Sequence, residues 1–271
     1  MRILAISTAL VVFAFTTGIS HAQRGWPQPS AGPSASGGPE LVLSFDDGPD
    51  PGTTPIVLDL LRAHGIRAVF FQVAWRDRRG DIARAQALQA RIVREGHIIG
   101  NHTISHAQLC AVPLEVAKEE ILGARALLEE AAAMPLPWFR TPYGARCPRV
   151  EQVLDELDLV HFHWDIDPQE WRGLGPKATA AKVIQQLARL DGRAVLLMHD
   201  TKFATRFALP EILAWIDAEN LRRAKVGRPG IKIIGADRIA AEAIAPTVAW
   251  LTRAFSIGRD DLSNGLFATV P

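Results

Sequence analysis

Short apolar runs alternate with longer amphipathic stretches over most of the chain. The apolar runs are rich in Val, Ile, Leu and Phe and are bounded by polar residues, which is typical of buried strands. They predict strands at residues 41–45, 68–73, 97–100, 138–140, 160–164, 194–198 and 231–234. The stretches between them predict helices at residues 54–64, 82–95, 113–133, 149–157 and 177–190, with a further helix from Pro210.

Capping and turn residues support the first helix of this pattern. Thr54 is expected as its N-cap, Pro55 as its first residue, and Gly65 ends it. Repeated strand–helix units predict an α/β fold with a parallel sheet. The number of units favours a (β/α) barrel of seven or eight parallel strands over an open sheet, in a single domain without an internal repeat.

The first 22 residues have the pattern of a secretory leader. Arg2 precedes an apolar run at residues 3–15, and small side chains lead to a predicted cleavage after Ala22. A membrane anchor is the less favoured interpretation, because the run is shorter than the roughly 20 apolar residues that span a bilayer. We therefore expect the mature protein to be exported, periplasmic or secreted, and free of the membrane.

The remaining chain divides into a linker and one domain. Residues 23–38 are rich in Pro, Gly, Ser and Ala and are expected to be flexible. The domain spans residues 39–271, with its core at about 40–235. Without the leader, Lys and Arg balance Asp and Glu, so the basic excess of a nucleic-acid-binding protein is missing. We expect no nucleic-acid partner, and a monomer.

Reactive side chains follow the predicted strands at their carboxyl ends. The first, third, fourth, fifth and sixth strands are followed by Asp46 and Asp47, His102 and His106, residues 140–144 with Arg140, Asp165 and Asp167, and His199 with Asp200. In a parallel barrel these ends share one face, where loops from different strands assemble a site. We expect these residues to meet there.

Asp47, His102 and His106 are the predicted metal ligands. Two histidines four residues apart point the same way on a tight turn, and a carboxylate from a neighbouring loop completes three ligands. Zinc with three protein ligands keeps a position for water, which is typical of a catalytic site. A lone His-x-x-x-His pair is more often a solvated turn, but the Asp46–Asp47 pair favours metal. Asp46 is then free to act as a general base.

Four segments carry a family resemblance. SFDDGPDPGTTPIVLDLLRAHGIRAVFF, GHIIGNHTISH, RTPYG and LLMHD, in this order, resemble the motifs of the polysaccharide deacetylases, the NodB-homology domain of carbohydrate esterase family 4. The resemblance covers about residues 40–234. It implies a distorted (β/α) barrel that removes acetyl groups from sugar amides or esters with a divalent metal, commonly zinc.

Position by position, the resemblance also implies catalytic roles. Asp46 would be the base, and Arg140 would hold it in place. The backbone N–H of Tyr143 would help to stabilise the oxyanion, and His199 would protonate the leaving amine. The three metal ligands are those named above.

The fourth motif, WDIDPQEW, departs from the family pattern. An acid there normally orients the catalytic histidine, and we predict Asp167 for this role, with Asp165 as the competitor. Glu170 stands where an Asp is expected before Trp171. Trp171, like Trp75, could line the acetyl pocket or stack on a sugar, although core packing is equally compatible with either.

The expected activity is metal-assisted removal of N-acetyl groups from a polysaccharide or oligosaccharide such as peptidoglycan, a chitin-like chain or an exopolysaccharide. O-deacetylation is the alternative, since an ester needs the same groups. A non-catalytic carbohydrate-binding protein on the same barrel is a third possibility, but such a protein would not need an intact set of base, ligands and acid.

Cys110 and Cys147 are the only cysteines in the chain. Each lies four residues after a predicted site residue, His106 or Tyr143, so they occupy the loops that leave the third and fourth strands. In an exported protein we expect them to form a disulfide, the alternative being two separate thiols.

Overall fold

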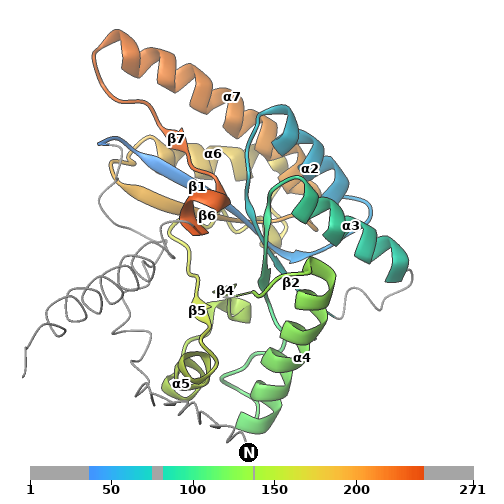
Figure 1. The fold of residues 1–271 in the computed structure, drawn as a ribbon. Coiled ribbons are helices and arrows are strands. Elements are labelled where there is room, and N and C mark those ends of the chain that lie inside the picture. Colours follow the sequence, from blue (N-terminus) through green and yellow to red (C-terminus); the bar gives the residue numbers. More distant parts are fainter. Residues whose placement is uncertain (1–36, 75–81, 137, 241–271) are drawn as a thin grey trace, which may run out of the picture.

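The computed structural model describes residues 37–74, 82–136 and 138–240. Within these ranges seven parallel strands form one curled sheet with helices packed around it (Figure 1), which confirms the predicted α/β fold. The leader, most of the linker, Trp75 and the segment after residue 240 lie outside the described residues.

The strand order places neighbouring motifs side by side. The strands are β1 (Glu40–Gly48), β2 (Val69–Gln72), β3 (Ile98–Asn101), β4 (Trp138–Phe139), β5 (Val160–His161), β6 (Arg193–His199) and β7 (Lys232–Ile233). Their order is β5-β4-β3-β2-β1-β6, and β7 pairs with the start of β1. After β5 the chain crosses to β6, where Ile166 forms a parallel bridge with Leu196. This bridge joins the two edges of the curled sheet.

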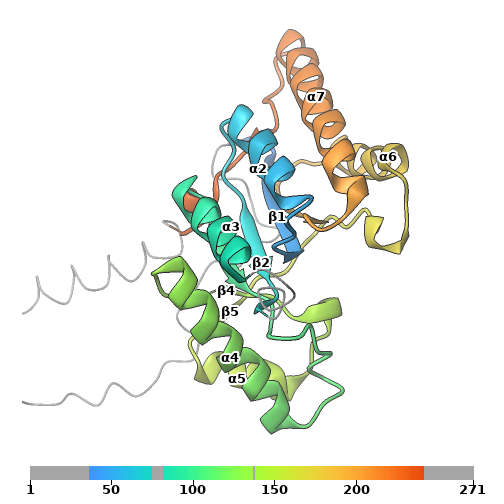
Figure 2. The ribbon, with the colours of Figure 1, turned by 90° about the vertical axis from the view of Figure 1, so that its right-hand side faces the viewer.

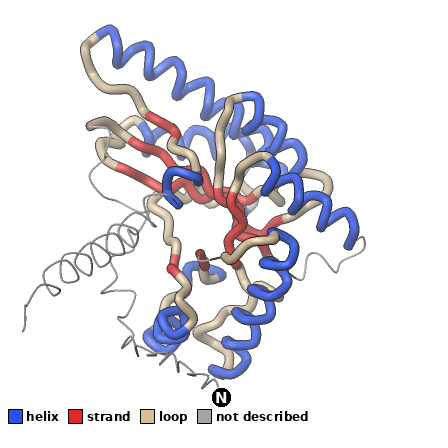
Figure 3. Tube along the Cα trace, viewed as in Figure 1, coloured by secondary structure: helices blue, strands red, loops and turns tan. Residues whose placement is uncertain are grey.

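Helices alternate with the strands along the chain. They are α2 (Thr54–Ala63), α3 (Ile82–Arg94), α4 (Leu114–Ala132), α5 (Pro148–Glu156), α6 (Pro176–Leu187) and α7 (Phe203–Lys225). Figure 2 shows α4 beside α5 and α6 beside α7, and in Figure 3 the blue helices surround the red strands on several sides. Among the described residues, no helix combines the length and apolarity needed to cross a membrane.

The alternation of side chains along β1 divides the core into two layers. Leu41, Leu43 and Phe45 pack towards the helices, whereas Val42 belongs to the cluster of strand residues inside the curled sheet. Because successive strand residues point to opposite faces, Ser44 and Asp46 share the inner face with Val42. The pleat therefore directs the Asp46 carboxylate into the mouth of the curled sheet.

The helix start predicted at Pro210 is wrong. α7 begins at Phe203, so Pro210 lies inside it. Ala204, Ala208 and Leu209 are buried in this segment, and their packing keeps the helix continuous although Pro210 cannot donate a backbone hydrogen bond.

The predicted cap of α2 is also displaced. Thr53, not Thr54, precedes the helix. The Thr54 hydroxyl instead donates to Asp200 Oδ2 at 2.5 Å and accepts the Asp50 N–H at 2.8 Å. Thr54 is therefore used to connect α2 to the end of β6.

The predicted disulfide between Cys110 and Cys147 is confirmed, with a Cα–Cα distance of 6.0 Å. The residues are 37 positions apart in the sequence. In the chain-entropy view, closing a loop of this length stabilises the fold by about 4 kcal/mol. The bridge fastens the loop after His106 to the start of α5.

Candidate active site

The Asp46–Asp47 pair lies at the end of β1, where the backbone turns sharply. Asp47 has a φ of +74°, a left-handed conformation that is uncommon outside glycine. Gly48 follows against the Asp200 carboxylate, which a Cβ at this position would overlap. This turn directs the two adjacent carboxylates to different partners.

Asp47, His102 and His106 converge as predicted. Their ligand atoms all lie within 4.8 Å of one another. Asp47 Oδ1 is 3.2 Å from His106 Nε2 and 3.8 Å from His102 Nε2. One carboxylate and two imidazole nitrogens form a donor set that suits zinc, and three protein ligands are the number found in catalytic sites. The residues present therefore fit a divalent metal.

His102 is held in the form that binds metal. Its Nδ1 lies 2.7 Å from the Arg140 carbonyl oxygen, which can only accept, so the proton is on Nδ1 and Nε2 carries the free lone pair. Burial lowers the pKa of His102 and keeps the ring neutral despite the nearby Asp46 and Asp47. The ring is thus oriented without the metal.

Hydrogen bonds fix the loop that carries His106. The His106 N–H donates to Thr103 Oγ1 at 3.0 Å, and the Thr103 N–H donates to Asn101 Oδ1 at 2.9 Å. Asn101 in turn donates to the Ile121 carbonyl of α4. Both Thr103 and His106 have positive φ, at +72° and +65°, and these contacts stabilise that uncommon geometry.

Arg140 holds Asp46, as the sequence predicts. Its Nη1 donates to Asp46 Oδ1 at 2.7 Å and to Ser44 Oγ at 3.0 Å. Its Nε donates to the Phe162 carbonyl, and its Cζ lies 4.1 Å from the centre of the Phe71 ring. Burial lowers the pKa of Arg140, but the guanidinium remains charged at physiological pH because its ordinary value is so high.

Glu170, rather than Asp167 or Asp165, contacts His199, which corrects the sequence prediction. Glu170 Oε1 lies 2.8 Å from His199 Nδ1 and accepts the His199 N–H at 2.7 Å. Burial lowers the pKa of His199, but Glu170, aided by Asp46 and Asp47, raises it above its usual value. The residue that departs from the family pattern thus makes the orienting contact.

The two aspartates of this motif have structural partners. Asp167 Oδ1 accepts the Gln169 N–H, and Oδ2 lies 3.5 Å from Trp171 Nε1. Asp165 Oδ2 accepts the Val195 N–H of β6 at 2.8 Å. Both carboxylates shape the segment that brings Glu170 to His199.

Two of the remaining predicted residues, Tyr143 and Trp171, lie at the surface. Tyr143 is exposed and lies in the 3₁₀ turn η2 (Pro142–Gly144). Its ring packs edge-to-face with the His106 ring, with the ring centres 4.6 Å apart. Trp171 is 48% exposed, which excludes simple core packing for this side chain. Trp75 cannot be placed because it lies outside the described residues.

The sequence prediction gave no role to Asp200, which is fully buried beside the β1 turn. Burial raises its pKa to about 7, and the negative charge of Asp47 contributes in the same direction. Its position directly after His199, at the end of a predicted buried strand, is the signal that the sequence offers.

Comparisons with known proteins agree on one family. A family model described as polysaccharide deacetylase matches residues 34–162. A chitooligosaccharide deacetylase of Bradyrhizobium sp. is 34% identical over 61% of this chain and 72% of its own length. A peptidoglycan-N-acetylglucosamine deacetylase of Bacillus cereus is 32% identical over 67% and 84%. The structure of a family 4 carbohydrate esterase from Streptomyces lividans with acetate is 28% identical, with a TM-score of 0.58 over 67% of this chain and 89% of that chain.

Glu170→Gln is expected to lower the pKa of His199, because glutamine keeps a hydrogen-bond acceptor but removes the negative charge. Asp167→Asn, the matched control, is expected to leave this pKa unchanged. A pH titration of the His199 ring signals by NMR, under the same metal conditions for each variant, measures both. A shift in the Asp167 variant alone would contradict the assignment of Glu170.

Proposed function

The chain belongs to the polysaccharide deacetylase family and is a hydrolase, and we propose that it removes N-acetyl groups from a chitin-like or peptidoglycan-type glycan with a bound zinc ion. One observation carries this proposal. Asp46 is paired with Arg140 at 2.7 Å, whereas Asp47 lies 3.2 Å from His106 Nε2. His102 Nε2 lies between the two carboxylates, 3.7 Å from Asp46 and 3.8 Å from Asp47. This separation provides a base beside a metal site.

Asp47, His102 and His106 would hold the metal. When bound, such an ion acts as a Lewis acid that polarises the acetyl carbonyl and makes water more acidic. Two imidazole nitrogens and one carboxylate oxygen are a ligand set found in zinc hydrolases, and this supports zinc as the proposed ion.

Asp46 would accept the proton of the attacking water. It is 97% buried, and Arg140 fixes one of its two oxygens, so Oδ2 is the oxygen that remains for the water. Asp46 Oδ2 lies 3.7 Å from His102 Nε2, close to the metal ligands without being one of them. This position suits a general base.

Tyr143 and His199 would act on opposite sides of the amide C–N bond that breaks, the first at the acetyl group and the second at the nitrogen. The backbone N–H of Tyr143 would donate to the oxyanion that forms on the acetyl carbon. His199 would then donate a proton to the leaving nitrogen as acetate departs. The raised pKa of His199 keeps more of it protonated near neutral pH, where an acid is needed.

The presence of a general acid favours an amide substrate over an ester substrate. An amine is a poor leaving group without a proton, whereas an alkoxide from a sugar ester leaves more easily. The contact between Glu170 and His199 supports N-deacetylation for this reason. The names of the relatives, chitooligosaccharide and peptidoglycan-N-acetylglucosamine deacetylase, agree with an N-acetylated substrate.

Acetate release from a panel of glycans tests the proposed reaction. We expect zinc-loaded protein to release acetate from N-acetylglucosamine oligomers or peptidoglycan fragments, and not from O-acetylated xylan. Dialysis against a chelator should abolish turnover, and added zinc should restore it. Release from the O-acetylated substrate alone would favour the esterase alternative. Tight glycan binding without any acetate release would favour a non-catalytic binding protein.

Replacements of the base and of a ligand should have separable effects. Asp46→Asn is expected to lower kcat by about 10²- to 10⁴-fold, the usual contribution of a general base, with zinc still bound. His102→Ala should lose both zinc and activity, because it removes one of three ligands. Measuring zinc content and acetate release on the same samples shows whether the two effects are separate. Near-normal turnover in Asp46→Asn would show that another group is the base.

We also propose that the protein is exported. The leader pattern of residues 1–22 and the disulfide support this, because structural disulfides persist in oxidising compartments. Protein recovered from outside the cytoplasm should begin at Gln23 and contain no thiol that alkylates without reductant. An N-terminus at Met1, or two alkylated cysteines, would contradict export and maturation at this site.

A further inference from the structure

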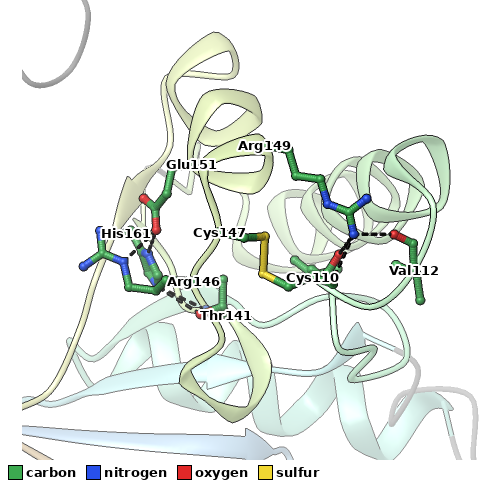
Figure 4. Close-up of a disulfide and its surroundings, with 9 residues drawn as sticks. Cys110, Val112, Thr141, Arg146, Cys147, Arg149, Glu151 and His161 are labelled. Atoms are coloured by element: carbon green, nitrogen blue, oxygen red, sulfur yellow. Dashed lines mark hydrogen bonds and ion pairs between the residues drawn. A yellow bond between two sulfur atoms is a disulfide. The ribbon is translucent and has the colours of Figure 1, made fainter.

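Three side chains form a chain of hydrogen bonds beneath the turn that carries Tyr143. Thr141 Oγ1 lies 3.0 Å from His161 Nε2, and His161 Nδ1 lies 2.9 Å from Glu151 Oε1 (Figure 4). Arg146 donates to the same Glu151 oxygen at 2.7 Å. The Glu151 carboxylate can only accept, so Nδ1 carries the proton and Nε2 accepts the Thr141 hydroxyl.

The order hydroxyl, imidazole, carboxylate is that of a nucleophilic triad, but burial excludes this use. Thr141 is 1% exposed and His161 is 6% exposed, so no glycan can reach the hydroxyl. Hydrogen bonds from His161 and Arg146 lower the pKa of Glu151 to about 2, against the opposing effect of burial. The carboxylate is thus permanently charged and orients the imidazole.

Thr141 is the residue on which the oxyanion turn begins. Its carbonyl accepts the Gly144 N–H at 3.2 Å and so closes the turn around Tyr143. Tyr143 has a φ of +61°, which costs a non-glycine residue energy unless its neighbours hold it. Arg140, which precedes Thr141, is paired with Asp46, so the Thr141 hydroxyl adds a second side-chain contact at the start of the same short segment.

The helix that carries Glu151 is itself fixed against the metal-ligand loop. Cys147 begins α5 and forms the disulfide with Cys110. Arg149 Nη2 donates to the carbonyls of Cys110 at 2.7 Å and Val112 at 2.8 Å (Figure 4). Both acceptors lie in the loop that follows His106. Movement of α5 would therefore affect the ligand loop and the oxyanion turn together.

We propose that Thr141, His161 and Glu151 are positioning residues that aim the Tyr143 N–H at the reacting carbonyl, with α5 setting its place relative to His106. This inference rests on the proposed deacetylase function. None of the three touches substrate, so their contribution should appear in kcat rather than in KM.

Matched variants of Thr141 give the first test. Thr141→Val keeps the shape but removes the hydroxyl, and a misplaced oxyanion donor is expected to lower kcat about 10-fold with little change in KM. Thr141→Ser restores the hydroxyl and should recover most of that loss. Thr179→Val removes an equally buried hydroxyl, on α6, and should leave kcat unchanged.

A second pair on α5 covers the case in which Thr141→Val does not fold. Glu151→Ala removes the carboxylate from His161 and should lower kcat in the same direction. Glu156→Ala, at the end of the same helix, is its control. Loss of kcat in Glu156→Ala equal to that in Glu151→Ala would overturn the proposal, because it would show a general effect of the helix.

Tyr143 also provides a readout that needs no turnover. It is the only tyrosine in the chain, so 3-fluorotyrosine labelling gives a single ¹⁹F resonance from the oxyanion turn. We expect this resonance to shift or broaden in Thr141→Val and Glu151→Ala, and to stay in place in Thr141→Ser and both controls. If the unlabelled wild type released no acetate, the proposed deacetylase function would be wrong. The ¹⁹F spectra would still show whether Thr141 and Glu151 fix the turn that carries Tyr143. An unchanged resonance and kcat in both test variants would overturn the inference.

Discussion

The buried ion pair between Arg140 and Asp46 is the interaction on which the rest of the site depends. A guanidinium with no exposed surface is costly unless its donors are satisfied, and here Asp46, Ser44 and two backbone carbonyls accept from it. These partners come from β1 and from the segment after β5, while the Arg140 carbonyl orients His102 after β3. One residue therefore links three parts of the sheet and holds Asp46 Oδ1 in an ion pair, while Asp46 Oδ2 lies 3.7 Å from His102 Nε2.

The parallel sheet makes this arrangement possible. Asp46 pairs in register with His199 on β6, and Asn101 with Phe139 on β4. The proposed base, acid and ligands and Arg140 therefore lie at or just after strand ends on one side of the sheet. The pleat of β1 places Asp46 inside, and the left-handed Asp47 then redirects the chain towards His106. Backbone geometry and the Arg140 ion pair thus give two adjacent carboxylates different surroundings.

The sequence predicts much of this structure, and its errors have physical causes. Strands and the disulfide were predictable because burial and strand-end position leave direct patterns in the chain. The sequence does not predict the Glu170 contact, because a 3₁₀ turn after a left-handed Gln169, rather than simple spacing, decides which acid of WDIDPQEW reaches His199. The helix start predicted at Pro210 is wrong because tertiary packing outweighs the local propensity of proline. The Thr141–His161–Glu151 contact joins residues from separate elements and has no local signal.

A crystal structure of the protein soaked with zinc tests the central claim, the division of labour between the two aspartates, most directly. Anomalous difference density should show one ion in contact with Asp47, His102 and His106, while Asp46 remains paired with Arg140. An ion bound by Asp46, or an Arg140 side chain released from Asp46 when zinc is present, would contradict this account.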